Sequence, residues 1–267
     1  MFRTKFFLLF YLCLFPLCLR ATRVAYFYAL DADFAEFIKQ AGPPLTSQNV
    51  GMTSIHQFTV QGHLVYVVKM ESGSMRTGIN TEALLAKYPC DVLLSTGVVG
   101  ALVNNLEIGE WLKITKVVAW QKGSYTQGGF NLDSKATLLV ENSEISTAIP
   151  AIWEGLRSAS SASGDAFIGS DNFRDELAST TGSSTVDMNL YGMLSAVNNH
   201  RLNSYHFRVV SDLADDNASS DFSRFVNDYD GVGGKAAYEW ISRLADDLTS
   251  PQSHNHLQRI LKLKEIE

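Results

Sequence analysis

The sequence predicts an α/β fold with a mixed, mainly parallel central sheet that is flanked by helices. Two observations carry this prediction: short runs of β-branched and aromatic residues recur along the chain, and segments with helical spacing of apolar residues separate them. Strands that alternate with helices are typical of a sheet built largely from parallel crossovers. The runs with strand character include 23–30, 91–96 and 207–212, and the helical segments include 34–39, 75–88, 190–200 and 222–248.

The length and composition indicate one α/β domain, or at most two small ones. The chain has 267 residues, and 46% of them are hydrophobic, which is enough for a sizeable core. The formal net charge of -6 provides no basic stripe to neutralise phosphates, so no nucleic-acid partner is expected. A small uncharged or cationic ligand suits this surface better.

Residues 1–21 are typical of a signal peptide. Arg3 and Lys5 precede an uncharged, apolar run from Phe6 to Leu19, as in the basic and apolar regions of export leaders. The run is short for a membrane-spanning helix. We therefore expect an exported, periplasmic protein or one tethered to a membrane through this leader. An uncleaved anchor, and a cytoplasmic protein in which the leader is not used, stay open as alternatives.

The folded domain is expected over residues 22–249, followed by a charged tail at 250–267. Cys90 is the single cysteine of the domain, because Cys13 and Cys18 lie in the leader. An internal disulfide and a cysteine zinc site are therefore excluded. The sequence also lacks the glycine-rich dinucleotide and ATP motifs and the G-x-S-x-G motif of serine hydrolases. We expect no metal and no cofactor.

The first half of the domain begins with a strand, Arg23–Leu30, whose aromatic and β-branched residues indicate burial. A helix follows from Phe34 to Lys39 and ends at Gly42-Pro43-Pro44. Asp31 and Asp33 fall where acidic residues favour a helix amino terminus, so capping explains them. Two strands, a helix, a buried strand and a tight glycine turn are then expected at 55–60, 63–70, 75–88, 91–96 and 97–101.

The second half is expected to contain one long surface loop, the polar and glycine-rich stretch Gln121–Asp133. A helix is expected from Ile145 to Arg157, ahead of a run of small residues at 158–163. The last helix, Phe222–Leu248, is interrupted near Gly231–Gly234. A strand at 111–120, a short helix at 170–177 and a buried helix at 190–200 complete the prediction.

The stretch Phe207–Asp215 is the strongest candidate for chemistry. Its apolar run contains Arg208, ends in Ser211-Asp212 and continues into the polar segment 216–220. Ligands in α/β folds bind beyond the carboxyl ends of strands, so a binding site is expected here. The alternative is a core strand that ends in a helix cap, since Ser and Asp are common capping residues.

Five short segments follow one another along the chain: Thr96-Gly97-Val98-Val99-Gly100, Glu107-Ile108-Gly109-Glu110, Gly164-Asp165-Ala166-Phe167-Ile168, Val186-Asp187-Met188-Asn189 and Arg208-Val209-Val210-Ser211-Asp212. Together, in this order, they resemble the purine nucleoside phosphorylase/nucleosidase family. The chain is most similar to its 5'-methylthioadenosine/S-adenosylhomocysteine nucleosidases, and in particular to the divergent aminofutalosine-hydrolase branch that serves menaquinone synthesis. The resemblance covers about Val24 to Leu248.

The resemblance implies four catalytic residues. Asp212 matches the aspartate that protonates N7 of adenine, and Ser211 matches its hydrogen-bonding neighbour. Asp33 matches the acidic residue, glutamate in the family, that activates the attacking water. Arg208 matches an arginine near that water.

The resemblance also implies a binding site for a purine nucleoside. Phe167 matches the ring that stacks on the base, and Ile168 matches the residue whose backbone contacts it. Met188 matches the residue beneath the ribose, and Asn189 stands at the ribose-binding position. Val98, Val99 and Gly100 belong to the glycine segment beside the base.

These residue types suit the cleavage of an N-glycosidic bond. The purine leaves with a pair of electrons and needs a proton, so a carboxylic acid must be poised near it. Burial disfavours a charged carboxylate and suits Asp212 to this task. A second carboxylate, Asp33, would activate water on the opposite side, as in inverting glycosidases. A buried Arg208 needs a partner, for which Glu71 or Asp33 is expected.

Several residues depart from the family pattern. Asn189 replaces a ribose-binding glutamate, and Asp187 faces away if the segment is extended, so it cannot substitute. Asp33 is one methylene shorter than glutamate, and Glu71 replaces a glycine. Ser95 stands where phosphorylases carry a cation, so water is preferred over phosphate as the nucleophile.

The predicted function is therefore hydrolysis of a 5'-modified adenosine with release of adenine. Aminofutalosine, methylthioadenosine and S-adenosylhomocysteine are the candidate substrates, in that order. A catalytically silent nucleoside-binding module and a nucleoside phosphorylase remain as alternatives. The resemblance also makes a homodimer possible.

Overall fold

The computed structural model describes residues 21–50, 53–140 and 149–248, and these form a mixed α/β fold as predicted. Six α-helices and twelve strands alternate along this part of the chain. In chain order the elements are β1 (Arg23–Tyr28), α1 (Asp31–Ala41), β2 (Thr46–Val50), β3 (Thr53–Val60), β4 (His63–Lys69), α2 (Ser74–Lys87), β5 (Val92–Ala101), β6 (Trp111–Ala119), β7 (Gly123–Thr126), β8 (Gly129–Leu132), η1 (Ser134–Ala136), β9 (Thr137–Leu139), η2 (Ala151–Trp153), β10 (Arg157–Ser163), α3 (Asp171–Thr181), β11 (Thr185–Asp187), α4 (Leu190–Asn199), β12 (Asn203–Asp212), α5 (Ala218–Asp228) and α6 (Val232–Leu248).

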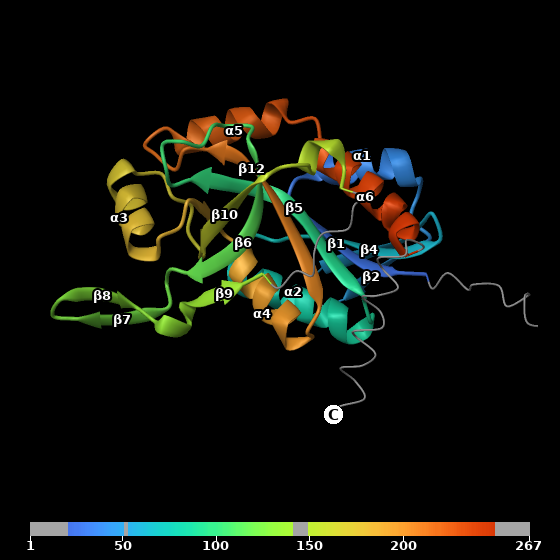
Figure 1. Cartoon of the computed structure of the whole chain (residues 1–267), viewed down its shortest axis with the longest axis horizontal. Helices are drawn as coiled ribbons and strands as arrows, with labels where there is room; N and C mark the ends of the chain where they lie inside the picture. Colours follow the sequence, from blue (N-terminus) through green and yellow to red (C-terminus); the bar gives the residue numbers. More distant parts are fainter. Residues whose placement is uncertain (1–20, 51–52, 141–148, 249–267) are drawn as a thin grey trace, which may run out of the picture.

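The central sheet is mixed, with parallel pairing at its centre (Figure 1). Its strand order is β11-β10-β6-β12-β5-β1-β4-β3-β2, and β4, β1, β5 and β12 are parallel neighbours. On one side β4, β3 and β2 pair antiparallel, and on the other β6 is antiparallel to β12 and parallel to β10, which is parallel to β11. The short strand β11 also pairs with the end of β5, so the sheet curls back on itself on that side. This curl brings the carboxyl ends of β5, β11 and β12 together.

Helices cover both faces of the sheet (Figure 1). One core contains α1 and α6, and the other contains α2 and α4. Strand β1 shows how the sequence divides between them, because successive side chains of a strand point to opposite faces. Tyr26 belongs to the first core and Phe27 to the second, and both are fully buried. The strong aromatic content of this segment therefore serves two packed layers.

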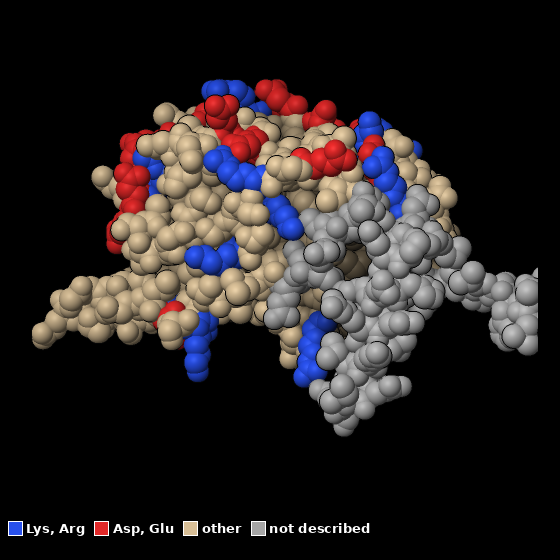
Figure 2. Space-filling view, viewed as in Figure 1, with Lys and Arg blue, Asp and Glu red and all other residues tan. Residues whose placement is uncertain are grey.

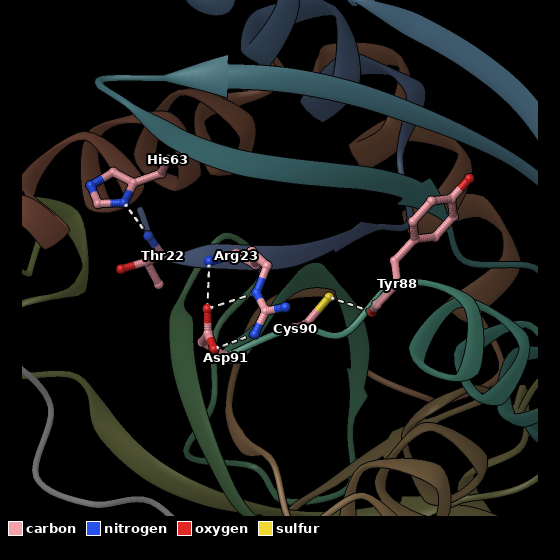
Figure 3. A network of polar contacts seen from close by, with 6 residues as sticks. All are labelled: Thr22, Arg23, His63, Tyr88, Cys90 and Asp91. Carbon is pink, nitrogen blue, oxygen red and sulfur yellow. Dashed lines mark hydrogen bonds and ion pairs between the residues drawn. The ribbon is translucent and has the colours of Figure 1, made fainter. Parts of the chain in front are cut away.

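The start of β1 is fixed by a polar network at the amino ends of the parallel strands (Figure 3). The Arg23 guanidinium donates to both carboxylate oxygens of Asp91 (2.9 and 3.2 Å), and the Arg23 backbone N–H donates to the same carboxylate (2.8 Å). Beside it, the Thr22 N–H donates to Nδ1 of His63 at 3.2 Å. Burial raises the pKa of the Cys90 thiol to about 12, which disfavours the reactive thiolate form.

Three predicted elements differ in the structure. Residues 97–101 do not turn but continue β5, because their glycines allow close approach of β11 and β12. The expected loop Gln121–Asp133 contains the β7–β8 hairpin, which projects from the body of the fold (Figure 1). The expected helix over 145–157 is wrong in its described part, where Pro150 precedes a single 3-10 turn and Gly155 has φ 66°.

The run of small residues at 158–163 is strand β10, which begins at Arg157. Its serines and alanines are small enough to pack between β6 and β11. The predicted leader and the charged tail lie outside the described residues, apart from Ala21. No helix in the described ranges is both long and apolar enough to cross a membrane.

Candidate active site

A cavity of about 280 Å³ lies at the carboxyl ends of β1, β4, β5, β11 and β12. It lies where the sequence placed the chemistry, beyond the end of the strand that carries Ser211-Asp212. The structure brings nine of the eleven predicted site residues to its wall. These are Val98, Val99, Gly100, Phe167, Ile168, Met188, Asn189, Ser211 and Asp212. Asp33 and Arg208 are not among the lining residues.

Ser211 and Asp212 reach the cavity because the β12–β5 pairing is irregular at this point. Val210 pairs with Val99 and Asp212 pairs with Gly100, which leaves Ser211 as an extra residue in β12. Such a bulge bends the strand and re-aims the side chains beside it. Two consecutive residues of one strand can therefore line the same cavity, although a regular strand would point them to opposite faces.

The Asp212 carboxyl group has two close partners. Its Oδ2 accepts from the Ser211 hydroxyl at 2.8 Å, and its Oδ1 accepts from the Ala214 N–H at 3.0 Å. The Ser211 hydroxyl also lies 3.2 Å from the Val99 carbonyl. A hydroxyl has one proton, so the protonated carboxyl also fits this network: it donates to Ser211, which then donates to Val99.

The surroundings of Asp212 raise its pKa above the ordinary value of 3.8, chiefly because the group is buried. The hydrogen bonds from Ser211 and Ala214 oppose this shift, and the nearby charges of Asp221 and Asp215 add to it. A carboxyl group in this environment keeps its proton to higher pH than usual. This is the property of a general acid.

Gly100 leaves the space that Asp212 occupies. A Cβ atom at this position would lie 2.8 Å from Oδ1 of Asp212 and 3.1 Å from Cγ1 of Val186. The glycine is therefore required by close packing and not by a turn, which is where the sequence-based expectation erred.

Two phenylalanine rings stand at the cavity. Phe167 is 48% exposed, and its ring lies edge-on to Phe222 of α5, with centroids 5.9 Å apart. Phe222 lines the cavity but was not predicted as a site residue. The available signal was its position four residues after Ala218, a buried residue on the inward face of an exposed helix.

Asp187 also lines the cavity and was set aside in the sequence analysis. Its carboxylate accepts from the hydroxyls of Ser161 (2.5 Å) and Ser163 (3.0 Å). It also accepts from the backbone N–H groups of Asn189 and Leu190, both at 2.7 Å. Asp187 thus fixes the start of α4, and its lone pairs are engaged within the protein.

Asn189 is held by its side-chain amide. Its Nδ2 donates to the Glu71 carbonyl and, at 3.1 Å, to the Thr77 hydroxyl. The amide oxygen accepts no hydrogen bond from any residue in the described ranges. Asn189 therefore joins the cavity wall to the loop that precedes α2.

Asp33 is buried away from the cavity wall, with 1% of its surface exposed. It does not cap its own helix α1, where the cap has no side-chain hydrogen bond. Instead its Oδ1 accepts from the Tyr229 hydroxyl (2.7 Å) and from the Gly234 N–H at the start of α6 (3.0 Å). Its Oδ2 accepts from the Thr96 hydroxyl at 2.8 Å. Burial raises the pKa of Asp33, and these three donors oppose the shift.

Arg208 is also buried, and the expected ion pair with Glu71 or Asp33 is absent among the described residues. Its Nη1 donates to the carbonyl and hydroxyl oxygens of Ser95 and to the Phe207 carbonyl, at 2.9 to 3.2 Å. Glu71 instead lies 3.8 Å from Arg76. Burial lowers the pKa of Arg208 to about 10, against the attraction of the Asp187 and Asp33 charges.

The described part of the chain contains no cluster of three or more His, Cys, Asp or Glu side chains placed to hold a metal ion.

The mixed sheet, the cavity at its strand ends and the buried carboxyl group at the cavity wall define an α/β fold of a known class. The chain belongs to the phosphorylase superfamily, whose family model matches residues 23–237. This match covers the domain from the first strand into α6.

Solved structures share the fold at low sequence identity. The Helicobacter pylori 5'-methylthioadenosine/S-adenosylhomocysteine nucleosidase, complexed with an inhibitor, aligns with a TM-score of 0.74 and 19% identity, over 84% of this chain and 99% of that one. Futalosine hydrolase of H. pylori strain 26695 aligns with the same values. The Streptococcus pyogenes S-adenosylhomocysteine nucleosidase, in complex with 5-methylthiotubericidin, aligns with a TM-score of 0.72 and 15% identity, over 84% and 98%.

Proposed function

We propose that this protein is a purine nucleosidase that hydrolyses the N-glycosidic bond of a 5'-modified adenosine and releases adenine. The observation that carries the proposal is the placement of Asp212, a carboxyl group with a raised pKa at the wall of a mainly apolar cavity. The cavity also presents an aromatic ring, Phe167, against which a base can stack.

In the proposed mechanism Asp212 protonates the purine as the glycosidic bond breaks. The two electrons of that bond go to the purine, and the proton from Asp212 neutralises the charge that develops there. The sugar becomes an oxocarbenium-like cation, water adds to its anomeric carbon and releases a proton to solvent, and Asp212 takes up a proton from solvent to restore the acid. Ser211 orients the carboxyl group through its hydroxyl.

For the activation of the attacking water we infer a mechanism that differs from the one expected from the sequence. Asp33 and Arg208 lie behind the wall, and the Asp33 carboxylate is engaged by three donors. In our proposal Asp33 is a buried charge and a cap for α6. Water then attacks a cation that is electrophilic enough to need little deprotonation in advance.

Water is the preferred nucleophile because the site offers nothing to hold phosphate. No Lys, Arg or His side chain of the described ranges lines the cavity. Ser95, at the position where phosphorylases carry a cation, is fully buried against His206 and Arg208. Acidic side chains gather over α3 and α5 (Figure 2). This negative surface disfavours an oxyanion.

The substrate candidates are aminofutalosine, methylthioadenosine and S-adenosylhomocysteine. The similar structures include a futalosine hydrolase and several methylthioadenosine/S-adenosylhomocysteine nucleosidases, which supports this group of substrates. The test is to incubate the purified protein with each nucleoside and follow adenine by chromatography. Release of adenine from none of the three, together with no effect of Asp212→Asn on any turnover, would refute the enzymatic proposal.

The second candidate function is a nucleoside-binding module without turnover. Asn189 favours it, because a neutral amide cannot stabilise the sugar cation as a carboxylate does, a loss on the order of 10²–10³ in rate. Tight adenine binding by calorimetry, with no adenine release, would support this alternative. A phosphorylase is eliminated if turnover is unaffected by removing phosphate.

We also propose that the protein is exported through residues 1–21 and that it forms a homodimer. Cell fractionation with N-terminal sequencing of the mature protein tests the first proposal. Light scattering of the purified chain tests the second. A cytoplasmic chain that starts at Met1, or a monomer at all concentrations, would contradict them.

A further inference from the structure

One segment of the cavity wall is a short loop that depends on other elements for its position. The loop Glu71–Ser74 leads from β4 into α2 and contributes Ser72 to the cavity. Gly73 stands at the cap of α2 with φ 110° and has no side chain to satisfy the first N–H groups of the helix. The loop therefore needs hydrogen-bonding partners from outside its own segment.

Asp165, in the segment that follows β10, provides one of these partners. It precedes the wall residues Ala166 and Phe167, and its Oδ1 accepts from the Ser74 N–H at 2.5 Å. Asp165 is itself held by Gln121, whose Oε1 accepts from the Asp165 N–H at 3.0 Å. A carboxylate at the amino end of α2 is also favoured by the helix dipole.

Asn189 provides the second partner from the opposite direction. Its two amide hydrogens are directed to the Glu71 carbonyl and to the Thr77 hydroxyl, and Thr77 in turn donates to the Glu71 carbonyl at 2.8 Å. The three groups form a closed triangle around the start of the loop. A carboxylate at position 189 would have no hydrogens for these acceptors.

We propose that Asp165 and Asn189 are positioning residues that clamp the loop Glu71–Ser74 from two sides, and that the clamped loop sets the affinity of the cavity for its nucleoside. The proposal rests on the proposed function for the identity of the ligand. It gives Asn189 a reason of its own: the amide replaces a ribose-binding carboxylate because the loop requires two hydrogen-bond donors at this place.

The test uses the full purified chain and two readouts. Hydrogen exchange of the segment 71–77 reports on the clamp, and calorimetry with adenine reports on the affinity. We expect Asp165→Ala and Asn189→Asp each to make this segment exchange about ten-fold faster and to weaken adenine binding by about ten-fold, the usual range for a lost helix cap or buried donor. The turnover number of Asp165→Ala should stay within about two-fold, because Asp165 does not line the cavity and Asp212 lies on a different element.

The chain offers matched controls. Asn131 in the β7–β8 hairpin likewise donates to a threonine hydroxyl and a backbone carbonyl, and Asp133 likewise accepts a backbone N–H at a helix start. Asn131→Ala and Asp133→Ala should change neither readout. Asp165→Asn keeps an oxygen for the Ser74 N–H, so it should stay close to the wild type in both. Asp165 is exposed, so its variants are expected to fold.

Three results would overturn the proposal. Unchanged exchange with weaker binding would mean that these side chains contact the ligand directly. Faster exchange with unchanged binding would mean that the loop does not set the affinity. Higher turnover in Asn189→Glu with full protection of the loop would mean that the loop does not need the amide. If the wild type neither binds adenine nor cleaves nucleosides, the proposed function fails, and unchanged exchange would still refute the clamp on its own.

Discussion

Replacing Asp212 with asparagine is the most direct test of the site. The substitution keeps the shape of the side chain and removes the transferable proton. An asparagine oxygen can still accept from the Ala214 N–H, now at 3.0 Å from Oδ1, and its amide can donate to the Ser211 hydroxyl, now at 2.8 Å from Oδ2. The bulge and the fold should therefore survive, and a loss of rate reports on the proton alone.

The expected loss of rate in Asp212→Asn follows from the role of Asp212 as a general acid. General acid catalysis contributes roughly 10²–10⁴ in rate, which corresponds to about 2.7–5.4 kcal/mol of barrier. We expect Asp212→Asn to lower kcat by this factor with a small change in KM. The assay is adenine release at saturating nucleoside, measured across pH.

The pH profile provides an independent check. The active form of Asp212 is protonated, and burial raises its pKa, so the rate should fall as pH rises through that pKa. This alkaline limb should disappear in Asp212→Asn. Ser211→Ala should keep the limb and move it to higher pH, because the Ser211 hydroxyl lowers the pKa of Asp212. An Asp212→Asn variant that retains more than about a tenth of wild-type turnover, below the usual contribution of an acid, would refute the reasoning.

Three further predictions concern groups around the site. Asp33→Asn should lower the thermal midpoint by a few degrees and reduce kcat less than about ten-fold, because Asp33 accepts from the Gly234 N–H at the start of α6 and does not line the cavity. Gly100→Ala should reduce kcat by at least about ten-fold, because its Cβ would stand 2.8 Å from Asp212. Burial keeps the folded pKa of His206 well below 6.5, and the positive charge of Arg208 adds to this shift. The neutral His206 contributes fully to stability above its pKa in the unfolded chain, and this contribution is lost as the pH falls below that pKa. The free energy of unfolding should drop by up to about 1.4 kcal/mol per pH unit, which lowers the thermal midpoint by about 3 °C.

Each of these predictions has a control. A loss of about 100-fold in kcat for Asp33→Asn, with an unchanged thermal midpoint, would mean that Asp33 activates the attacking water. Gly128→Ala meets no atom closer than 3.8 Å, so equal losses in both glycine variants would contradict the packing argument. The acid loss of stability should flatten in His206→Gln, measured by calorimetry from pH 7 to 5. An unchanged slope would assign it to other groups.

The sequence predicted strands and helices correctly wherever a pattern of apolar residues is compatible with only one type of element. Continuous apolar runs located β1, β5 and β12, and Ser211-Asp212 at the end of such a run marked the cavity correctly. The spacing of apolar residues located α2 and α4 to within one residue of their ends. These features are local, so no tertiary contact was needed to recognise them.

The errors arose where one residue type serves two purposes. Gly97 and Gly100 were assigned to a turn, because glycine favours turns, but here they permit close packing of neighbouring strands. The small residues of β10 have weak strand propensity and form a strand because both sides are paired. The partners of Asn189, and the partners Tyr229 and Gly234 of Asp33, come from segments more than a hundred residues away, which no local pattern reveals.

The number of donors that each buried carboxyl group meets decides which one can act as an acid. Asp187 accepts four hydrogen bonds, and Asp33 accepts three, so their lone pairs are largely committed to holding α4 and α6. Asp212 accepts two, one of them from a hydroxyl that can reverse its role and accept a proton instead. Each further hydrogen bond to a carboxylate stabilises the anion. All three aspartates are buried at strand or helix ends, and Asp187 and Asp33 also have hydroxyl partners, so neither burial nor a hydroxyl alone distinguishes them. The smaller number of donors at Asp212, one hydroxyl and one backbone N–H, does.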